Sequence, residues 1–301
     1  MQQEPINLVE FQSRFATEEA CQDHLFRMRW PDGYRCPRCG HSHAYNLPKR
    51  RLYQCKGCGY QASLTAGTIF HKTRIPLRKW FWLVFLMSRQ KSGISMLSMQ
   101  RMLGIRCYKT VWVMGHKVRK AMADRDACYK LAGMIEMDDA YFGAPKVGKR
   151  GRGAAGKAKV VVAVENRGDK PGFATMCQVE RVSGEEIHQS LRGHLKQGCT
   201  VRTDGWKAYR VFDSTQSTHE PTIIGQGRNA VNALPWVHTL LANIKGNIRG
   251  VYHGVNPKHL NLYLPEFCYR FNRRFWESQL FDRLLTACLN TSTITLSELK
   301  S

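Results

Sequence analysis

The chain has 301 residues, enough for two or three small domains with their own cores, and its hydrophobic content of 43% is ordinary for a globular protein. Lys and Arg number 46 against 23 Asp and Glu, which gives a formal net charge of +23. An excess this large predicts a polyanionic partner, with nucleic acid favoured over the alternative of a protein that is merely basic. The most apolar run, residues 80–87, is much shorter than the roughly 20 residues that cross a bilayer. We therefore expect a cytoplasmic protein with no membrane partner.

Changes in composition divide the chain into five parts. Apolar residues at near-helical spacing predict a short helical lead, and a segment of turn residues, cysteine pairs and aromatic side chains follows it. Helical patterns come next, then a long region that mixes β-branched runs with helical patterns, and a short tail. The expected boundaries are 1–30, 31–70, 71–128, 131–285 and 286–301.

Two Cys-x-x-Cys pairs stand in the second part, separated by 15 residues. Four thiolates at this spacing are typical of a tetrahedral zinc ribbon, in which the metal holds the fold together and does no chemistry. A glycine after the second cysteine of each pair permits a tight turn. Basic residues around the pairs favour a DNA backbone over an ordinary solvated face. The expected zinc ligands are Cys36, Cys39, Cys55 and Cys58, and the basic residues are Arg35, Arg38, Lys49, Arg50, Arg51 and Lys56.

The third part favours two short helices joined at residues 103–105, which resemble a helix-turn-helix. The mixture of side chains on the second helix suits contacts with phosphates and the DNA groove, and a simple helical hairpin is the alternative. These side chains are Lys109, Thr110, Trp112, His116, Lys117, Arg119 and Lys120.

The fourth part predicts strands and helices of an α/β domain. The β-branched run at 159–165 is the clearest strand, and a turn at 168–172 joins it to a second strand in a hairpin. Further strands are expected at 134–142 and 199–204, and helices at 184–195, 234–249 and 260–289.

Acidic residues at strand ends are noticeable in so basic a chain. Asp138 and Asp139 lie in one expected strand, and Asp204 ends another. Two carboxylates brought side by side repel each other unless a cation lies between them. Oxygen ligands select Mg²⁺ or Mn²⁺, and two such ions can activate a water or a 3′-hydroxyl in phosphoryl transfer. Acids in two unrelated surface turns are the alternative interpretation.

The order of these features resembles the bacterial insertion-sequence transposases that join an amino-terminal zinc ribbon to a DDE-type catalytic domain. The segments that carry the resemblance are EMDDAYFG (136–143), TDGWKAY (203–209), 248–260 and 266–274. The resemblance implies an RNase H-like fold: an α/β domain with a mixed sheet flanked by helices. It also implies binding of terminal inverted repeats, metal-dependent cleavage of DNA ends, and strand transfer into target DNA. Synapsis of two ends implies at least a homodimer.

The resemblance assigns the first two catalytic acids to Asp138 and Asp204, with Asp139 as the alternative for the first. The family often has Glu at the third position and Lys seven residues later. In this chain Lys245 is present, but His238 stands seven residues before it. Positions seven apart return to nearly the same helix face, so His238 is the expected third ligand and Asn243 the alternative. A histidine ligand favours softer ions, which predicts that Mn²⁺ supports the reaction at least as well as Mg²⁺.

Basic and aromatic residues after Lys245 are interleaved in a way that suits handling of a DNA end. They are Tyr252, His253, Lys258, His259, Arg270, Asn272, Arg273 and Arg274. The aromatic residues Tyr263, Phe267, Tyr269 and Phe271 are expected in the core.

Two other functions fit parts of the pattern. A nuclease on the same fold is disfavoured by the zinc ribbon and the helix-turn-helix region. A catalytically inactive or co-opted transposase that still binds DNA is favoured by the missing third carboxylate.

Overall fold

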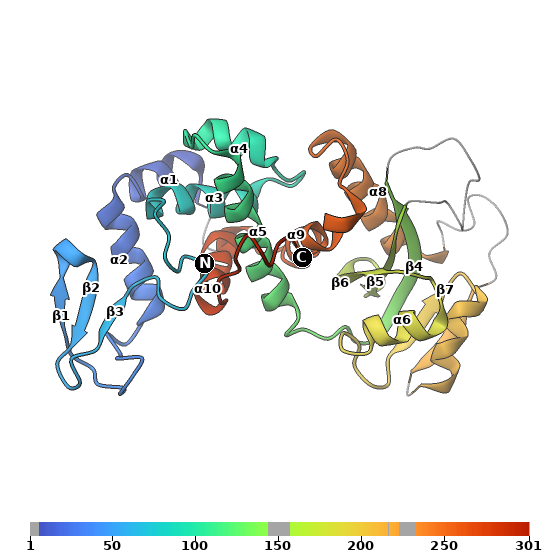
Figure 1. Cartoon of the computed structure of the whole chain (residues 1–301). Coiled ribbons are helices and arrows are strands. Elements are labelled where there is room, and N and C mark those ends of the chain that lie inside the picture. Colours follow the sequence, from blue (N-terminus) through green and yellow to red (C-terminus); the bar gives the residue numbers. More distant parts are fainter. Residues whose placement is uncertain (1–5, 144–156, 216, 223–232, 301) are drawn as a thin grey trace. The chain divides into compact units, whose positions relative to one another are not determined.

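The computed structural model describes residues 6–143, 157–215, 217–222 and 233–300, and they form two compact units (Figure 1). The ribbon–helix unit consists of residues 1–90, 96–122 and 275–301, and the sheet unit of residues 91–95 and 123–274. In the part of the chain that is described, no helix is both long and apolar enough to cross a membrane.

The sheet unit is built on five strands in the order β6-β5-β4-β7-β8. β4 pairs antiparallel with β5 and β5 antiparallel with β6, whereas β7 runs parallel to β4 and β8 parallel to β7. The strands are β4 (Met134–Phe142), β5 (Ala158–Asn166), β6 (Pro171–Val179), β7 (Thr200–Thr203) and β8 (Thr218–Pro221). The helices are α6 (Gly184–Leu191), the 3-10 helix η2 (Lys207–Ser214), α8 (Pro235–Gly250), the 3-10 helix η3 (Pro257–His259) and α9 (Leu260–Asn272).

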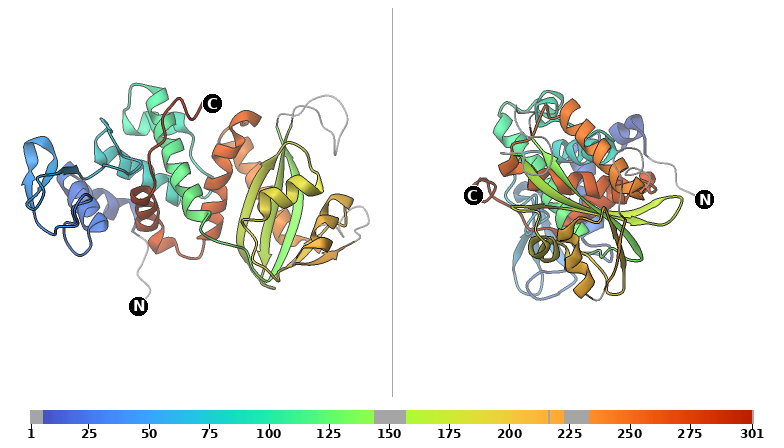
Figure 2. Two further views of the ribbon diagram at one scale, coloured as in Figure 1. Left: turned by 60° about the horizontal axis from the view of Figure 1, so that its bottom comes forward. Right: turned by 90° about the vertical axis from the view of Figure 1, so that its right-hand side faces the viewer.

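Helices cover both faces of this sheet (Figure 2). Along β4, the alternation of a strand sends Ala140 and Phe142 to one face, where they pack with α8 and α9. Ile135 and Met137 point to the other face and pack with α6 and η2. The expected α/β fold, an RNase H-like mixed sheet flanked by helices, is confirmed. The predicted strands at 134–142, 159–165 and 199–204 are all present, and so is the hairpin.

The ribbon–helix unit contains a small three-stranded antiparallel sheet and a helical part. Aromatic rings form the core of the helical part: Phe11 stacks on Phe85 at 4.1 Å, and Phe281 meets Phe11, Phe15 and Phe85 at 5.2–6.2 Å. The helices are α1 (Leu8–Arg14), α2 (Glu18–Arg29), η1 (Pro48–Arg50), α3 (Leu77–Arg89), α4 (Met96–Leu103), α5 (Tyr108–Asp126), η4 (Glu277–Gln279) and α10 (Leu280–Asn290). The strands are β1 (Ala44–Leu47), β2 (Leu52–Cys55) and β3 (Gln61–Ser63).

The compact units divide the chain differently from the boundaries expected from composition. The expected 131–285 domain and 286–301 tail separate at residue 285, inside α10, whereas the ribbon–helix unit takes up the chain again at residue 275. The reason lies in α10, because Phe281 is 3% exposed in the aromatic core that α1 and α3 form.

Two helices are present where a helix-turn-helix was expected, but part of the expected DNA-contacting face is buried. His116 and Arg119 of α5 are each 1% exposed. The prediction that these two side chains suit contacts with DNA is therefore wrong. Lys109, at the start of α5, is exposed.

Candidate metal centre and catalytic site

The four cysteines lie on two knuckles with matching hydrogen bonds. In the first, the N–H of Arg38 donates to Cys36 Sγ, and the N–H of Gly40 donates to the Cys36 carbonyl at 2.9 Å. In the second, the N–H of Gly57 donates to Cys55 Sγ, and that of Gly59 to the Cys55 carbonyl at 3.0 Å. Both closing glycines have a left-handed backbone, with φ of 75° and 69°, which is the conformation that glycine adopts without strain.

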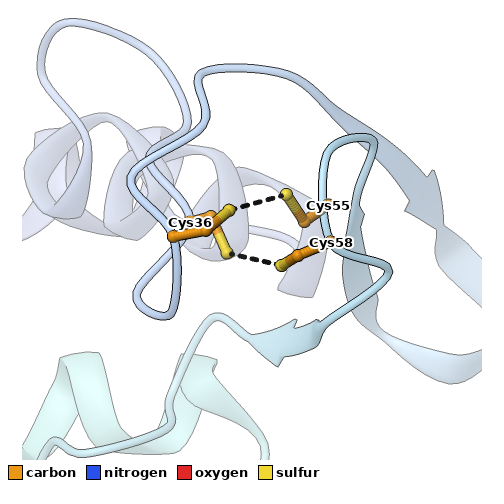
Figure 3. A group of neighbouring side chains, drawn as sticks. Cys36, Cys55 and Cys58 are labelled. Carbon is orange, nitrogen blue, oxygen red and sulfur yellow. Dashed lines mark hydrogen bonds between the residues drawn. The ribbon is translucent and has the colours of Figure 1, made fainter.

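The knuckles bring the four sulfurs into one cluster (Figure 3). Cys36 Sγ lies 3.7 Å from Cys58 Sγ, Cys39 Sγ lies 3.6 Å from Cys55 Sγ, and all four lie within 4.8 Å of one another. Four thiolates around a tetrahedral zinc with Zn–S bonds near 2.3 Å would be about 3.8 Å apart. The cluster therefore fits a zinc ion with four protein ligands and no open position.

The basic residues around the ribbon are exposed. In the described part of the chain none of them forms an ion pair with an acid, and Lys56 instead lies 4.8 Å from the ring of Tyr45. Arg51 closes the hairpin between β1 and β2 in a left-handed conformation, so three consecutive cations lie at the hairpin tip. These residues are Arg35, Arg38, Lys49, Arg50, Arg51 and Lys56.

The parallel pairing of β4 with β7 ends close to the first two candidate acids. Glu136 pairs with Arg202, the last pair of that ladder, and Asp138 and Asp204 each lie two residues further on. Adjacent strands are about 4.8 Å apart, and residues at the same level of parallel strands point to the same face. Alternation along β4 places Asp138 on the face of the sheet that α8 covers and Asp139 on the opposite face. β7 ends at Thr203, so the same face for Asp204, which directly follows it, stays an expectation from the register.

Local hydrogen bonds fix the backbone at both acids. The N–H of Asp139 donates to Asp138 Oδ1 at 2.8 Å, and the N–H of Trp206 donates to Asp204 Oδ1 at 3.0 Å. The turn at Asp204 is also held by Thr203, whose hydroxyl accepts from the N–H of Gly205. These bonds hold the Asp138 carboxylate against the backbone in the middle of β4, and that of Asp204 against the backbone directly after β7.

Glu136 attaches the start of α8 directly to the sheet. Its side chain is fully buried, and its Oε2 accepts from the N–H groups of Trp236 and Val237 at 2.8 and 3.0 Å. Its Oε1 accepts from the amide of Asn166 at 2.7 Å. Burial raises the pKa of Glu136, and these donors oppose that rise. The residue before α8 makes no side-chain cap of its own, so Glu136 caps the helix from β4.

This attachment sets where the α8 candidates lie. His238 follows the capped Val237, and Lys245 Nζ lies 6.0 Å from the ring centroid of Phe142, at the far end of β4. At about 100° per residue His238 and Lys245 lie on one line along the helix, so that line runs beside β4 at the level of Asp138. Asn243 is exposed on the opposite flank of α8. The role of Glu136 was not predicted from the sequence, because it is one of three acids in β4 and nothing in the sequence near it marks its backbone partners.

The structure does not bring the catalytic candidates together as closely as the cysteines. In the described ranges, the four cysteines alone form a group of three or more metal-binding side chains whose ligand atoms lie within 4.8 Å of one another. Asp138, Asp204 and His238 do not form such a group. Their assignment as metal ligands stays a prediction.

Several residues expected to handle a DNA end are used inside the sheet unit. Arg270 pairs with the fully buried Glu266, and Arg273 pairs with Asp126 at 2.6 Å and is 4% exposed. Asn272 is also 4% exposed and binds both backbone groups of Ala174. These three side chains stabilise the fold, so their predicted role in DNA handling is wrong. Phe267 and Tyr269 are buried. Tyr263 and Phe271 pack against the core cluster that the sheet forms with α8 and α9, as expected for core residues.

Comparison with known proteins identifies the family of both parts of the chain. Residues 130–272 match the ISXO2-like transposase domain, residues 16–61 match the transposase zinc-ribbon domain, and together the two matches cover more than half of the chain. The chain belongs to this family of transposases. A relative from Halobacterium salinarum, described as an uncharacterized protein in transposable element ISH50, is 27% identical to this transposase over 274 residues. The aligned part covers 84% of this chain and 90% of the relative.

We predict that replacing one thiolate abolishes zinc binding by this transposase. Purified wild-type protein should carry a single zinc ion per chain, and Cys55→Ser should retain less than about a tenth of it, because three remaining thiolates cannot close the tetrahedron. Metal analysis by mass spectrometry after gel filtration measures this content. Cys128→Ser, at an exposed cysteine outside the cluster, is the control. Equal zinc content in Cys55→Ser and wild type would contradict the assignment.

Removing the Glu136 carboxylate should loosen the start of α8. We expect Glu136→Ala to lower the free energy of unfolding by about 1–3 kcal/mol, because two N–H groups lose their buried acceptor. Urea denaturation gives this value, and hydrogen exchange of the Trp236 and Val237 amides should become faster. The control is Glu180→Ala in an exposed turn, which should change stability by less than about 0.5 kcal/mol. Similar losses in both variants would argue against the cap.

Proposed function

We propose that this transposase binds the terminal inverted repeats of its element, cleaves the DNA ends and joins them to target DNA. The observation that carries the proposal is the parallel register of β4 and β7, which ends at Glu136 and Arg202, two residues before Asp138 and Asp204. Two carboxylates in that relation suit a pair of Mg²⁺ or Mn²⁺ ions. Such ions would supply an activated nucleophile and stabilise the leaving oxygen of an in-line displacement.

The chain's own residues would position the DNA for this reaction. Asp138 and Asp204 would each contribute a carboxylate oxygen, and their strand positions would keep the two groups fixed relative to each other. His238 would supply the third ligand through a neutral imidazole nitrogen. Lys245, further along the same line of α8, would contact a phosphate near the scissile bond.

The ribbon supports a separate role in DNA binding. Its exposed cations, centred on the Lys49–Arg51 hairpin tip, suit contacts with phosphates, which would hold the DNA without reading its sequence. Because transposition needs two ends in one complex, we also propose that at least two copies of the chain assemble on the DNA.

A DNA-binding protein without catalytic activity is the second candidate function. His238 stands where a third carboxylate is common in the family, and the loss of that carboxylate favours this alternative. A protein of this kind would make the same DNA contacts, but it would not cleave DNA in Mg²⁺ or in Mn²⁺.

Asp138→Asn and Asp204→Asn should each abolish cleavage while leaving DNA binding intact. We expect the rate of end cleavage to fall by about 10³-fold or more, roughly 4 kcal/mol in the barrier, because each change removes an anionic metal ligand. The substrate is a duplex with the inverted repeat found beside the gene, and nicked and joined products are resolved on denaturing gels. Asp139→Asn, on the opposite face of β4, is the matched control and should cut at nearly the wild-type rate. Specific binding by wild type with no cleavage in Mg²⁺ or Mn²⁺ would select the inactive binder.

The third ligand is tested by comparing His238→Ala with Asn243→Ala in both metals. His238→Ala should lose cleavage by about 10²-fold or more in Mn²⁺, whereas Asn243→Ala should stay close to wild type, because it lies on the other flank of α8. Initial cleavage rates at saturating metal measure the difference. Indifference to His238→Ala, with activity in Mg²⁺ alone, would contradict the assignment.

A further inference from the structure

A cavity of about 560 Å³ lies beside the candidate catalytic face of the sheet unit. The end of β4, the residue that precedes β5, the second half of α8, the turn after it and the start of α9 form its walls. It belongs to one compact unit, and its volume lies within the range of sites that hold small organic ligands.

Four cations surround this cavity: Lys157, Lys245, Arg249 and His253 when protonated. Among the residues that the structure describes, none of the four forms an ion pair with an acid. Lys245 and Arg249 are four residues apart, so they project from the same face of α8. Cations held together without a counter-charge favour an anionic ligand.

Part of the lining is apolar, and we call it the floor: it consists of Phe142, Ile248, Val255 and Leu260. Phe142 and Leu260 are 6% and 1% exposed. The Nζ of Lys245 lies over Phe142, 6.0 Å from the ring centroid. A phosphate alone needs only the cations, whereas a ligand that fills this space also contacts apolar side chains.

The turn after α8 has an uncommon backbone at the edge of the cavity. His253 has φ of 52°, a left-handed conformation that is unfavourable for a residue other than glycine. The N–H of Gly254 donates to the Ile248 carbonyl at 3.1 Å and closes the turn. Such strain at a ligand-facing position is typical of binding sites.

We propose that this cavity binds one unpaired nucleotide of the DNA end, with its phosphate among the four cations and its base on the apolar floor. The inference rests on the proposed function, because the ligand is a nucleotide of the DNA that the transposase would process. The last base pair of a duplex exposes one face, but pairing holds each base in the duplex, so only an unpaired nucleotide can turn its base out of the helix and onto the floor. The site therefore selects ends whose last nucleotide is unpaired.

The test compares two DNA duplexes in binding to the full chain that carries Asp138→Asn, without added Mg²⁺ or Mn²⁺, so that no cleavage is required. One duplex is blunt, and the other has a single unpaired 2-aminopurine nucleotide at one 3′ end. We expect the second to bind about 10-fold more tightly, with a change in 2-aminopurine emission, because base stacking on a protein surface contributes at this scale. Equal affinity with unchanged emission would overturn the proposal.

Two variants then separate charge from shape. Arg249→Ala should reduce the preference to about 2-fold, and Val255→Phe should do the same without removing charge, because its ring occupies the floor. Arg192→Ala, an exposed arginine beside α6 on the other face of the sheet, is the matched control and should keep the preference. Equal weakening of both duplexes by Arg249→Ala, with no effect of Val255→Phe, would leave only a phosphate contact and overturn the nucleotide site.

This outcome is distinguishable from failure of the proposed function. A wild-type chain that cleaves its ends but shows no preference for the unpaired nucleotide would overturn the cavity proposal alone. A chain that shows the preference but never cleaves would support the cavity and overturn the catalytic proposal.

Discussion

The parallel pairing of β4 with β7 is the constraint on which the candidate active site depends. It fixes a register in which Glu136 and Arg202, which are 66 positions apart, share a level, and Asp138 and Asp204 each follow two residues later in the chain. A register shift of one residue would send one of the two carboxylates to the opposite face. The apolar residues on both faces prevent such a shift, because Val201 and Ile135 must stay in the cluster under α6.

Glu136 fixes the position of α8 relative to the sheet. A buried carboxylate is costly unless its lone pairs are satisfied, and here three N–H donors satisfy it. Two of those donors are the first amides of α8, so the cost of burial is offset only when the helix starts at this point of β4. The position of His238 and Lys245 along the sheet thus follows from one carboxylate two residues before Asp138.

Local patterns were enough to predict most strands of the α/β domain and the four-cysteine cluster, whereas the RNase H-like fold came from the family resemblance. Long-range partners explain where the sequence misled. The cysteine knuckles and the β-branched run at 159–165 are complete within a few residues, so their interpretation needs no tertiary contact. Arg273 looks like a DNA ligand in the sequence because its partner Asp126 is far away in the chain. The role of Glu136 was likewise invisible, because its ligands are backbone amides 100 and 101 residues away.

The chain has 23 acidic residues, and several of them form ion pairs inside the sheet unit and not at the ribbon hairpin tip or the cavity beside β4. Glu266, Asp126 and Glu165 are committed to Arg270, Arg273 and Arg167 within the sheet unit. These ion pairs occupy Arg270 and Arg273, which lie in a segment whose sequence suggested contacts with DNA. They leave the ribbon hairpin tip and the cavity beside β4 as places where cations face no acid in the described structure. These two places, one in each compact unit, are the ones where several cations gather without an acid in the described structure, and they are therefore the surfaces that we propose for contact with a polyanion.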